Sequence, residues 1–180
     1  MTSTTSTTNT TEATDMTNLT ANQTGTESYV PAPEQRFSMP AQAAEWYRAM
    51  IDLDRASRPS VDPALAELVR IHASNLNGCA FCLDMHTTDA RKEGEQEHRI
   101  YALPAWRETP YFTARERAAL ALTEAITLVT KGHVPDEVYN EAAAHFDPQQ
   151  LAQLIAVIIS INSWNRIAIT SRMSPAPKQS

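Results

Sequence analysis

The chain has 180 residues and a formal net charge of −6. An acidic chain with no visible basic patch lacks what phosphate binding requires, so nucleic acid is not expected as a partner. The longest mainly apolar run, Leu154–Ile161, is too short to span a bilayer and soon meets Asn162 and Arg166, so no membrane association is expected. These features favour a soluble, cytoplasmic protein.

The amino-terminal segment differs in composition from the rest of the chain. Twelve of its first thirty residues are threonine, and hardly any could contribute to a hydrophobic core. Such a segment buries too little apolar surface to offset its ordering entropy, so residues 1–35 are predicted to be a disordered tail. A secretory leader is not expected, because no apolar run follows Met1 and the first basic residue is Arg36. Residues 36–174 have the length of one domain with its own core.

Helix signals follow one another closely in the first half of this domain. Asp62 followed by Pro63 is a typical helix start, because aspartate caps the free amides and proline needs no amide partner there. Gly78 precedes a second helix that contains both cysteines, and Pro104 is expected to end a short one. Helices are therefore predicted for four segments of the first half: 40–55, 63–76, 78–92 and 95–103.

The second half continues with the same kind of pattern. Thr113 and Glu116 form a predicted capping box, and Asp147 followed by Pro148 repeats the earlier start signal. The last helix is apolar around much of its circumference, which favours burial at a subunit interface, with the central helix of the monomer as the alternative. No strand-like alternation is bounded by turns, so the fold class is all-α. Helices are predicted for three segments: 113–132, 135–145 and 147–170.

The chain contains only two cysteines, Cys79 and Cys82, and His86 follows one helical turn later. Residues three or four apart share one helix face, so these three side chains are expected to lie together. The start of a helix favours a thiolate, and the thiolate is the nucleophilic form. We therefore expect Cys82 to have a lowered pKa that depends on His86. The trio combines a nucleophile, a second thiol that can close a disulfide, and a base.

Such a trio suits thiol redox chemistry, in which a thiolate becomes a sulfenic acid and then a disulfide. Zinc sites also use a Cys-x-x-Cys element, but zinc usually needs four ligands and no second Cys/His pair follows. Inert buried cysteines are a further alternative. His72 is interpreted as a surface or satisfied core residue rather than a catalytic one. A thioredoxin-like site is disfavoured because the βαβ context is missing.

The spacing around the cysteines resembles the AhpD-like alkylhydroperoxidase branch of the carboxymuconolactone decarboxylase superfamily. The motif of that branch is a glutamate, eleven residues, Cys-x-x-Cys, three residues and a histidine. Glu67, Cys79, Cys82 and His86 match it in full. Further similar stretches span most of the predicted domain and exclude the tail: Asp89–Arg91 and Gly94, Leu103–Arg107, Thr113–Glu124 and Asn162–Arg166.

The resemblance implies an all-α, AhpD-like helical bundle that assembles as a homotrimer or homohexamer. It implies that Cys82 reacts with a small-molecule peroxide, that Cys79 resolves the product and donates a proton, and that His86 and Glu67 form a proton relay. No bound cofactor or metal is implied. Electrons would come from an external dithiol or a protein reductant. The alternatives are a general disulfide reductase, a redox-sensing scaffold, and a non-enzymatic module in which Cys79, Cys82, His86 and Glu67 hold zinc.

One residue departs from the pattern of the better-characterised alkylhydroperoxidases. They have a histidine of the relay just before the second cysteine, where this chain has Phe81. An aromatic hydrocarbon ring cannot shuttle a proton, so coupling between Glu67 and Cys79 must go through water or His86. Phe81 is expected to pack in the core and shape a pocket for an apolar peroxide. Lactone decarboxylation is not expected, because the decarboxylase branch generally lacks the cysteine pair.

Overall fold

The computed structural model describes Met1 and residues 30–176. The prediction of a disordered tail therefore falls mainly on residues outside the described part of the chain. Residues 32–176 belong to one compact unit. Between residues 30 and 176 all regular secondary structure is helical, which confirms the all-α fold class.

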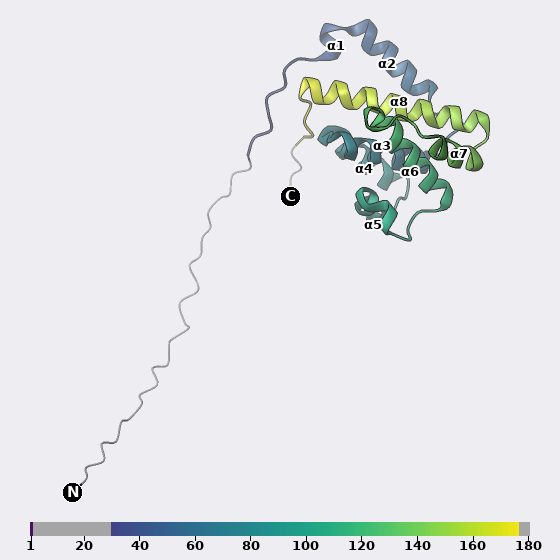
Figure 1. The fold of residues 1–180 in the computed structure, drawn as a ribbon. Helices are drawn as coiled ribbons and strands as arrows, with labels where there is room; N and C mark the ends of the chain where they lie inside the picture. The colour runs from purple at the N-terminus through teal and green to yellow at the C-terminus, as the bar shows by residue number, and fades with distance from the viewer. Residues whose placement is uncertain (2–29, 177–180) are drawn as a thin grey trace. The chain divides into compact units, whose positions relative to one another are not determined.

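Figure 1 shows the arrangement of the helices. Helix α8 is the longest, with α2 on one side of it and α3, α4 and α6 on the other. In chain order the elements are α1 (Met39–Gln42), α2 (Ala44–Ala56), α3 (Pro63–Asn77), α4 (Ala80–Lys92), α5 (Glu97–Ala102), the 3₁₀ helix η1 (Leu103–Glu108), α6 (Ala114–Thr127), the 3₁₀ helix η2 (Val129–Lys131), α7 (Asp136–His145) and α8 (Pro148–Ser171).

The predicted helix starts are confirmed at the level of hydrogen bonds. The Asp62 carboxylate accepts from the backbone amide of Leu65 at 3.0 Å, ahead of α3. Thr113 and Glu116 form the capping box of α6, in which each side chain accepts from the other's backbone amide. The Asp147 side chain caps α8 in the same way, with Gln150 as its partner. Each cap satisfies amides that the first turn of a helix leaves free.

Two predicted helices are each divided in the structure. The segment 113–132 forms α6 and then the 3₁₀ helix η2, because Leu128 leaves the helical region with φ −99° and ψ 34°. The segment 40–55 forms two helices rather than one, because Ala43 leaves the helical region with φ −141° and ψ 57°.

The predicted end of the short helix is confirmed within one residue, because α5 ends at Ala102 and the chain then continues as η1. Pro104 takes no part in α5. It lies in the first turn of η1, where a missing amide costs nothing because that amide has no helical partner.

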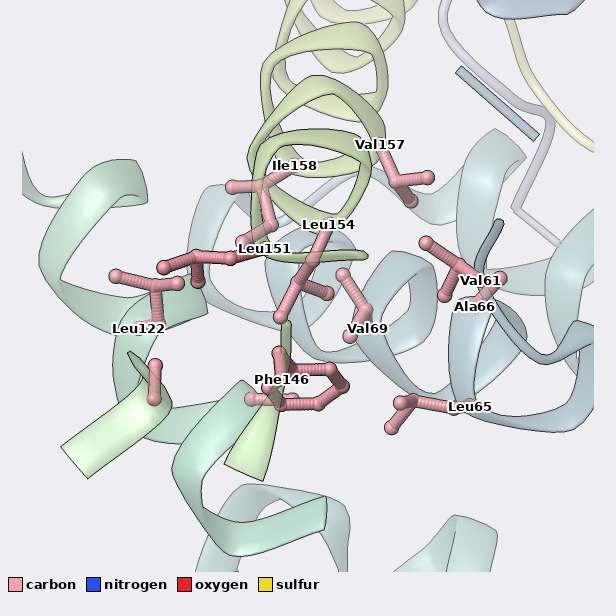
Figure 2. Packing of buried hydrophobic residues seen from close by; sticks show 12 residues of the cluster. Val61, Leu65, Ala66, Val69, Leu122, Phe146, Leu151, Leu154, Val157 and Ile158 are labelled. Atoms are coloured by element: carbon pink, nitrogen blue, oxygen red, sulfur yellow. The ribbon is translucent and has the colours of Figure 1, made fainter. Parts of the chain in front are cut away.

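Helix α8 is the central helix of the domain, which confirms the alternative interpretation of its apolar surface. Leu154, Val157 and Ile158 are fully buried and pack with α3 and α6 residues such as Val69 and Leu122 (Figure 2). Burial of one such side chain stabilises a fold by roughly 1.5–3 kcal/mol. This packing fixes α3 against α8, and α3 in turn carries several residues of the candidate site.

The length and composition of α8 would also suit a membrane span. It has 24 residues and a mean hydropathy of 1.3 in its most apolar window, 56% of which is buried inside the domain. The central helix of a folded domain has these same properties. Its packing with α2, α3, α4, α6 and α7 accounts for its apolar character.

Candidate active site

The connection between α3 and α4 positions both cysteines. Gly78 ends α3 in the left-handed conformation, with φ 68° and ψ 35°, which a residue with a side chain adopts less readily. Cys79 follows as the N-cap of α4, and Cys82 lies in the first turn of that helix. Both cysteines are buried and neither is in a disulfide. The Sγ atom of Cys79 accepts a hydrogen bond from the backbone amide of Cys82 at 3.4 Å.

The two thiols have opposite acid–base properties. The hydrogen bond from the Cys82 thiol, together with backbone amides and the Asn165 amide, lowers the pKa of Cys79 to about 7 despite burial. The same pairing, together with burial, raises the pKa of Cys82. The expectation that Cys82 has the lowered pKa was therefore wrong. As the N-cap, Cys79 receives the amides at the helix start, so it carries the first negative charge of the pair.

Glu67 and His86 are brought together across two helices, as the motif spacing predicted. Nδ1 of His86 lies 2.8 Å from Oε2 of Glu67. The other carboxylate oxygen accepts from Nη1 of Arg70 at 2.6 Å. All three side chains are at least mostly buried. Glu67 therefore holds the histidine ring in a fixed orientation, and Arg70 holds the carboxylate.

The environment keeps Glu67 ionised. Burial alone would raise the pKa of its carboxyl group, but the hydrogen bond and charge of His86 and the charge of Arg70 hold that pKa below its ordinary value. Among the described residues, no hydrogen bond joins Glu67 or His86 to either sulfur. The carboxylate and the thiols are thus adjacent parts of one site without a direct hydrogen-bonded link.

A cavity of about 330 Å³ opens beside the second cysteine. Cys82 and His86 lie in its wall, whereas Cys79 and Glu67 do not. Most of the remaining wall is apolar and comes from α2, α4, α8 and the segment after α8: Tyr47, Ile51, Phe81, Met85, Trp164 and Met173. Phe81 thus shapes the cavity as expected. A ligand in this cavity meets the thiol of Cys82 and the ring of His86 together.

A second cavity, of about 280 Å³, lies on the carboxylate side of the pair. Glu67 and Arg70 line it, together with charged residues at the end of α4 such as Lys92. Arg58 lines both cavities. The His86–Glu67 pair therefore extends from an apolar cavity on the histidine side to a polar one on the carboxylate side.

Sequence reasoning missed a set of amide side chains behind the cysteines. The Asn77 amide donates to the side-chain oxygens of Asn162 and Asn165, at 3.0 and 2.9 Å. Asn165 is fully buried and donates to Ser74 Oγ at 3.0 Å. These contacts tie the end of α3 to α8 and aim the Asn165 amide toward the thiols, whose pKa values it lowers.

His72 is a buried core residue, one of the two placements expected from the sequence, and one of its two ring nitrogens has a hydrogen-bond partner. It is 2% exposed, and its Nε2 lies 3.1 Å from Oε1 of Glu124. Glu124 also accepts from the Trp106 indole nitrogen at 3.0 Å and pairs with Arg107. His72 lies on the same helix as Glu67 but has no cysteine partner.

The donor set of the zinc alternative is not arranged as a metal site. Among residues 30–176, no group of three or more His, Cys, Asp or Glu side chains has the geometry to hold a metal ion. Nδ1 of His86 is already engaged by Glu67. The described residues therefore give the zinc hypothesis no geometric support.

Comparison with known proteins supports the family assignment. The model of the carboxymuconolactone decarboxylase family matches residues 41–125. The uncharacterized protein YdfG of Bacillus subtilis is 45% identical over 145 residues, which cover 80% of this chain and 99% of YdfG. This alignment includes most of the described domain.

Solved structures show the same relationship. A protein of unknown function from Agrobacterium tumefaciens, described as a candidate antioxidant defence protein AhpD, is 32% identical with a TM-score of 0.77, over 80% of this chain and 100% of that one. A peroxidase-related protein with an AhpD core from Ralstonia eutropha shares the fold, with a TM-score of 0.67 at 18% identity, over 77% of this chain and 74% of that one. The chain belongs to the carboxymuconolactone decarboxylase family, in its AhpD-like branch.

Proposed function

We propose that this protein is a thiol-dependent peroxidase of the alkyl hydroperoxide reductase type. One observation carries the proposal: Cys82 and His86 line a single, mainly apolar cavity, and the sulfur of Cys79 lies next to Cys82 in the first turn of α4. An organic hydroperoxide in this cavity would meet a thiol and a base on one wall. The second thiol does not line the cavity, and in this proposal it resolves the oxidised product.

The first step is the reduction of the peroxide. The Cys79 thiolate takes the proton of Cys82 along the hydrogen bond between them. The Cys82 thiolate then attacks the terminal oxygen of the hydroperoxide, so that an S–O bond forms and the O–O bond breaks. The leaving alkoxide takes a proton from the site, from protonated His86 or from Cys79, and departs as the alcohol. Cys82 is oxidised to a sulfenic acid, and the peroxide is reduced by two electrons.

The second step closes the disulfide. Cys79, as thiolate, attacks the sulfur of the Cys82 sulfenic acid, an S–S bond forms, and hydroxide leaves with a proton as water. A pKa of about 7 for Cys79 favours this step, because a substantial fraction of the resolving thiol is then ionised at neutral pH. His86 supplies and recovers protons, while Glu67, kept ionised, fixes the ring and stabilises its protonated form.

An external dithiol reduces the disulfide back to two thiols by thiol–disulfide exchange, and the dithiol is itself oxidised to a disulfide. We place this cycle in the cytoplasm, where such reductants keep thiols reduced.

We also propose a homotrimer or homohexamer. Large apolar side chains remain exposed on α2 and α8, among them Trp46, Leu53 and Ile159. Mass from light scattering, with a monomer as the contrary result, tests the assembly.

The first experiment is intact mass measurement under non-reducing conditions after one equivalent of cumene hydroperoxide, followed by alkylation of the remaining thiols. A peroxidase with a resolving cysteine loses two hydrogen atoms and both alkylation sites. Cys79→Ser should stop at a sulfenic acid that dimedone traps, and Cys82→Ser should leave the peroxide unconsumed. Peroxide consumption retained in Cys82→Ser would contradict the assignment of Cys82 as the cysteine that reacts with the peroxide.

Two further outcomes point to the alternatives. Thiols that stay fully alkylatable, with zinc bound per chain by elemental analysis, indicate the metal-binding module. Turnover of a disulfide substrate with no peroxide consumption indicates a general disulfide reductase.

A further inference from the structure

Two charged residues line the cavity beside Cys82 that the proposed reaction does not use. Asp54, on α2, and Arg58, just beyond the end of that helix, lie in the cavity wall. The Asp54 carboxylate accepts from Ser160 Oγ on α8 at 2.9 Å and from Nε of Arg58 at 3.1 Å, and it also accepts from Nη2 of Arg58. Asp54 is mostly buried, with a side chain 14% exposed, whereas the Arg58 side chain is 62% exposed.

This arrangement holds a guanidinium group with donors to spare. Both oxygens of Asp54 already accept hydrogen bonds, so the carboxylate is fixed and has little capacity for a ligand. Arg58 has five N–H donors, and within residues 30–176 its Nη1 donates to no protein acceptor. The cavity wall therefore offers N–H donors of Arg58, and a carboxylate matches a guanidinium group better than a neutral acceptor does.

The rest of the wall limits the size and character of the ligand. Tyr47 and Trp164 pack edge to face, with ring centroids 5.4 Å apart, and both line the cavity with Phe81. A cavity of about 330 Å³ is near the small end of the range for ligand pockets. It suits a single ring or a short branched chain rather than a long lipid chain.

We infer that the substrate is an amphiphilic acid hydroperoxide: a compact apolar body with a peroxide group that meets Cys82 and a carboxylate that binds Arg58. This inference rests on the proposed function for the peroxide group alone, since the recognition of a compact apolar acid depends only on the cavity. Asp54 balances part of the Arg58 charge and Arg58 is partly exposed, so the preference is moderate. We expect about a tenfold advantage for the carboxylate over its neutral analogue.

Two hydroperoxides of the same shape test this inference in turnover. Cumene hydroperoxide is neutral, and its para-carboxylate carries the acid at the opposite end of the ring from the peroxide. With a dithiol reductant, the wild-type kcat/KM should favour the carboxylate about tenfold, and this ratio should fall to about one in Arg58→Gln. Arg58→Lys should keep part of the preference, because the charge remains while the fork of donors is lost.

A matched control is available three residues before Arg58, in the last turn of α2. Arg55 pairs with Asp52 at 3.0 Å and is 75% exposed, but it does not line the cavity. Arg55→Gln should leave the wild-type ratio unchanged. Equal loss of preference in Arg55→Gln and Arg58→Gln would overturn the inference, since it would indicate a general effect of surface charge.

Binding of the product alcohols separates the inference from the proposed function, because alcohols bind without redox chemistry. We would titrate wild type and Arg58→Gln with 2-phenylpropan-2-ol and its para-carboxylate, by calorimetry and by tryptophan fluorescence, to which Trp164 in the cavity wall contributes. Selective binding of the carboxylate by wild type, lost in Arg58→Gln, supports the site even if no peroxide is consumed. Peroxide turnover with equal kcat/KM for both substrates and equal binding of both alcohols overturns the inference and leaves the peroxidase proposal standing.

Discussion

Helix α3 takes part in two buried histidine–glutamate pairs, and only one of them has a thiol beside it. Glu67 on α3 contacts His86 on α4 at 2.8 Å, and His72 on α3 contacts Glu124 on α6 at 3.1 Å. In both pairs the histidine is buried and the pKa of the carboxyl group is held below its ordinary value. The local chemistry of the two pairs is therefore nearly the same.

Their surroundings differ. His86 lies in the wall of a cavity together with Cys82. His72 is enclosed, with the Trp106 ring perpendicular to it at 6.4 Å between centroids, and its Nδ1 has no hydrogen-bond partner among the described residues. A proton on His86 can be passed to a ligand, whereas a proton on His72 has nowhere to go. Access and a neighbouring nucleophile, rather than the pair itself, make one of these pairs a candidate active site.

The largest expected effect is on turnover, and it separates the two histidines. His86→Gln should lower kcat/KM for cumene hydroperoxide by about 10²–10⁴-fold, because glutamine cannot exchange a proton at neutral pH. His72→Gln should stay within about threefold of wild type and instead lower the free energy of unfolding, by about 1–2 kcal/mol. Steady-state kinetics and urea denaturation of both variants check this. Similar losses of turnover in the two variants would mean that the comparison is wrong.

The next effect is on stability and separates the two glutamates. Arg70 is 5% exposed, so Glu67→Gln leaves a buried guanidinium without its ionic partner, which should cost about 3 kcal/mol. Glu124→Gln should cost about 1 kcal/mol, because the side chain of Arg107 is 53% exposed and water solvates it. Urea unfolding of the reduced proteins measures both. Equal losses would show that burial of the arginine does not decide the cost.

A smaller effect depends on pH. Burial lowers the pKa of His72, although Glu124 raises it in part, so the folded protein keeps this ring neutral. The unfolded chain takes up a proton at His72 below about pH 6.5, whereas the folded chain does so only at lower pH. Stability from this residue is thus present above that pH and is lost as the pH falls toward the folded pKa.

The measurement is the difference in unfolding free energy between wild type and His72→Gln, taken from about pH 7.5 to 5.5. The advantage of the wild type should shrink as the pH falls, by at most about 1.4 kcal/mol per pH unit, the limit for one proton. A difference that stays constant across this range would contradict a neutral buried His72.

The sequence alone predicted those features that depend on residues close to one another along the chain. Asp62 with Pro63, and Thr113 with Glu116, mark helix starts through contacts three residues apart, and both were predicted at the right positions. The Glu67–His86 contact spans two helices, and it was predicted from the motif spacing rather than from any local rule.

Features that depend on packing between distant helices were not predictable in this way. Arg58 reaches the cavity only because α2 packs on α8, and Asn165 reaches the thiols only because α8 packs on the end of α3. The distribution of charge between Cys79 and Cys82 was wrongly predicted for a related reason. It depends on which sulfur accepts the amides at the helix start. The predicted helix begins at residue 78, whereas α4 begins at Ala80 with Cys79 as its N-cap.

The smallest expected effect concerns the two thiols, Cys79 and Cys82. They lie beside the Glu67–His86 pair, whereas the His72–Glu124 pair has no thiol beside it. Cys79 should be alkylated by iodoacetamide with an apparent pKa of about 7, and Cys82→Ala should raise this pKa, because the largest stabilising contact of the Cys79 thiolate is the hydrogen bond from Cys82. One hydrogen bond contributes about 0.5–1.5 kcal/mol, so alkylation at neutral pH should slow by about threefold in Cys82→Ala. In Cys79→Ala the remaining Cys82 should react slowly, since burial still opposes its ionisation. If Cys82 instead proved to be the faster thiol, the negative charge would lie on the cavity side, and Cys82 would attack the peroxide without first passing its proton to Cys79.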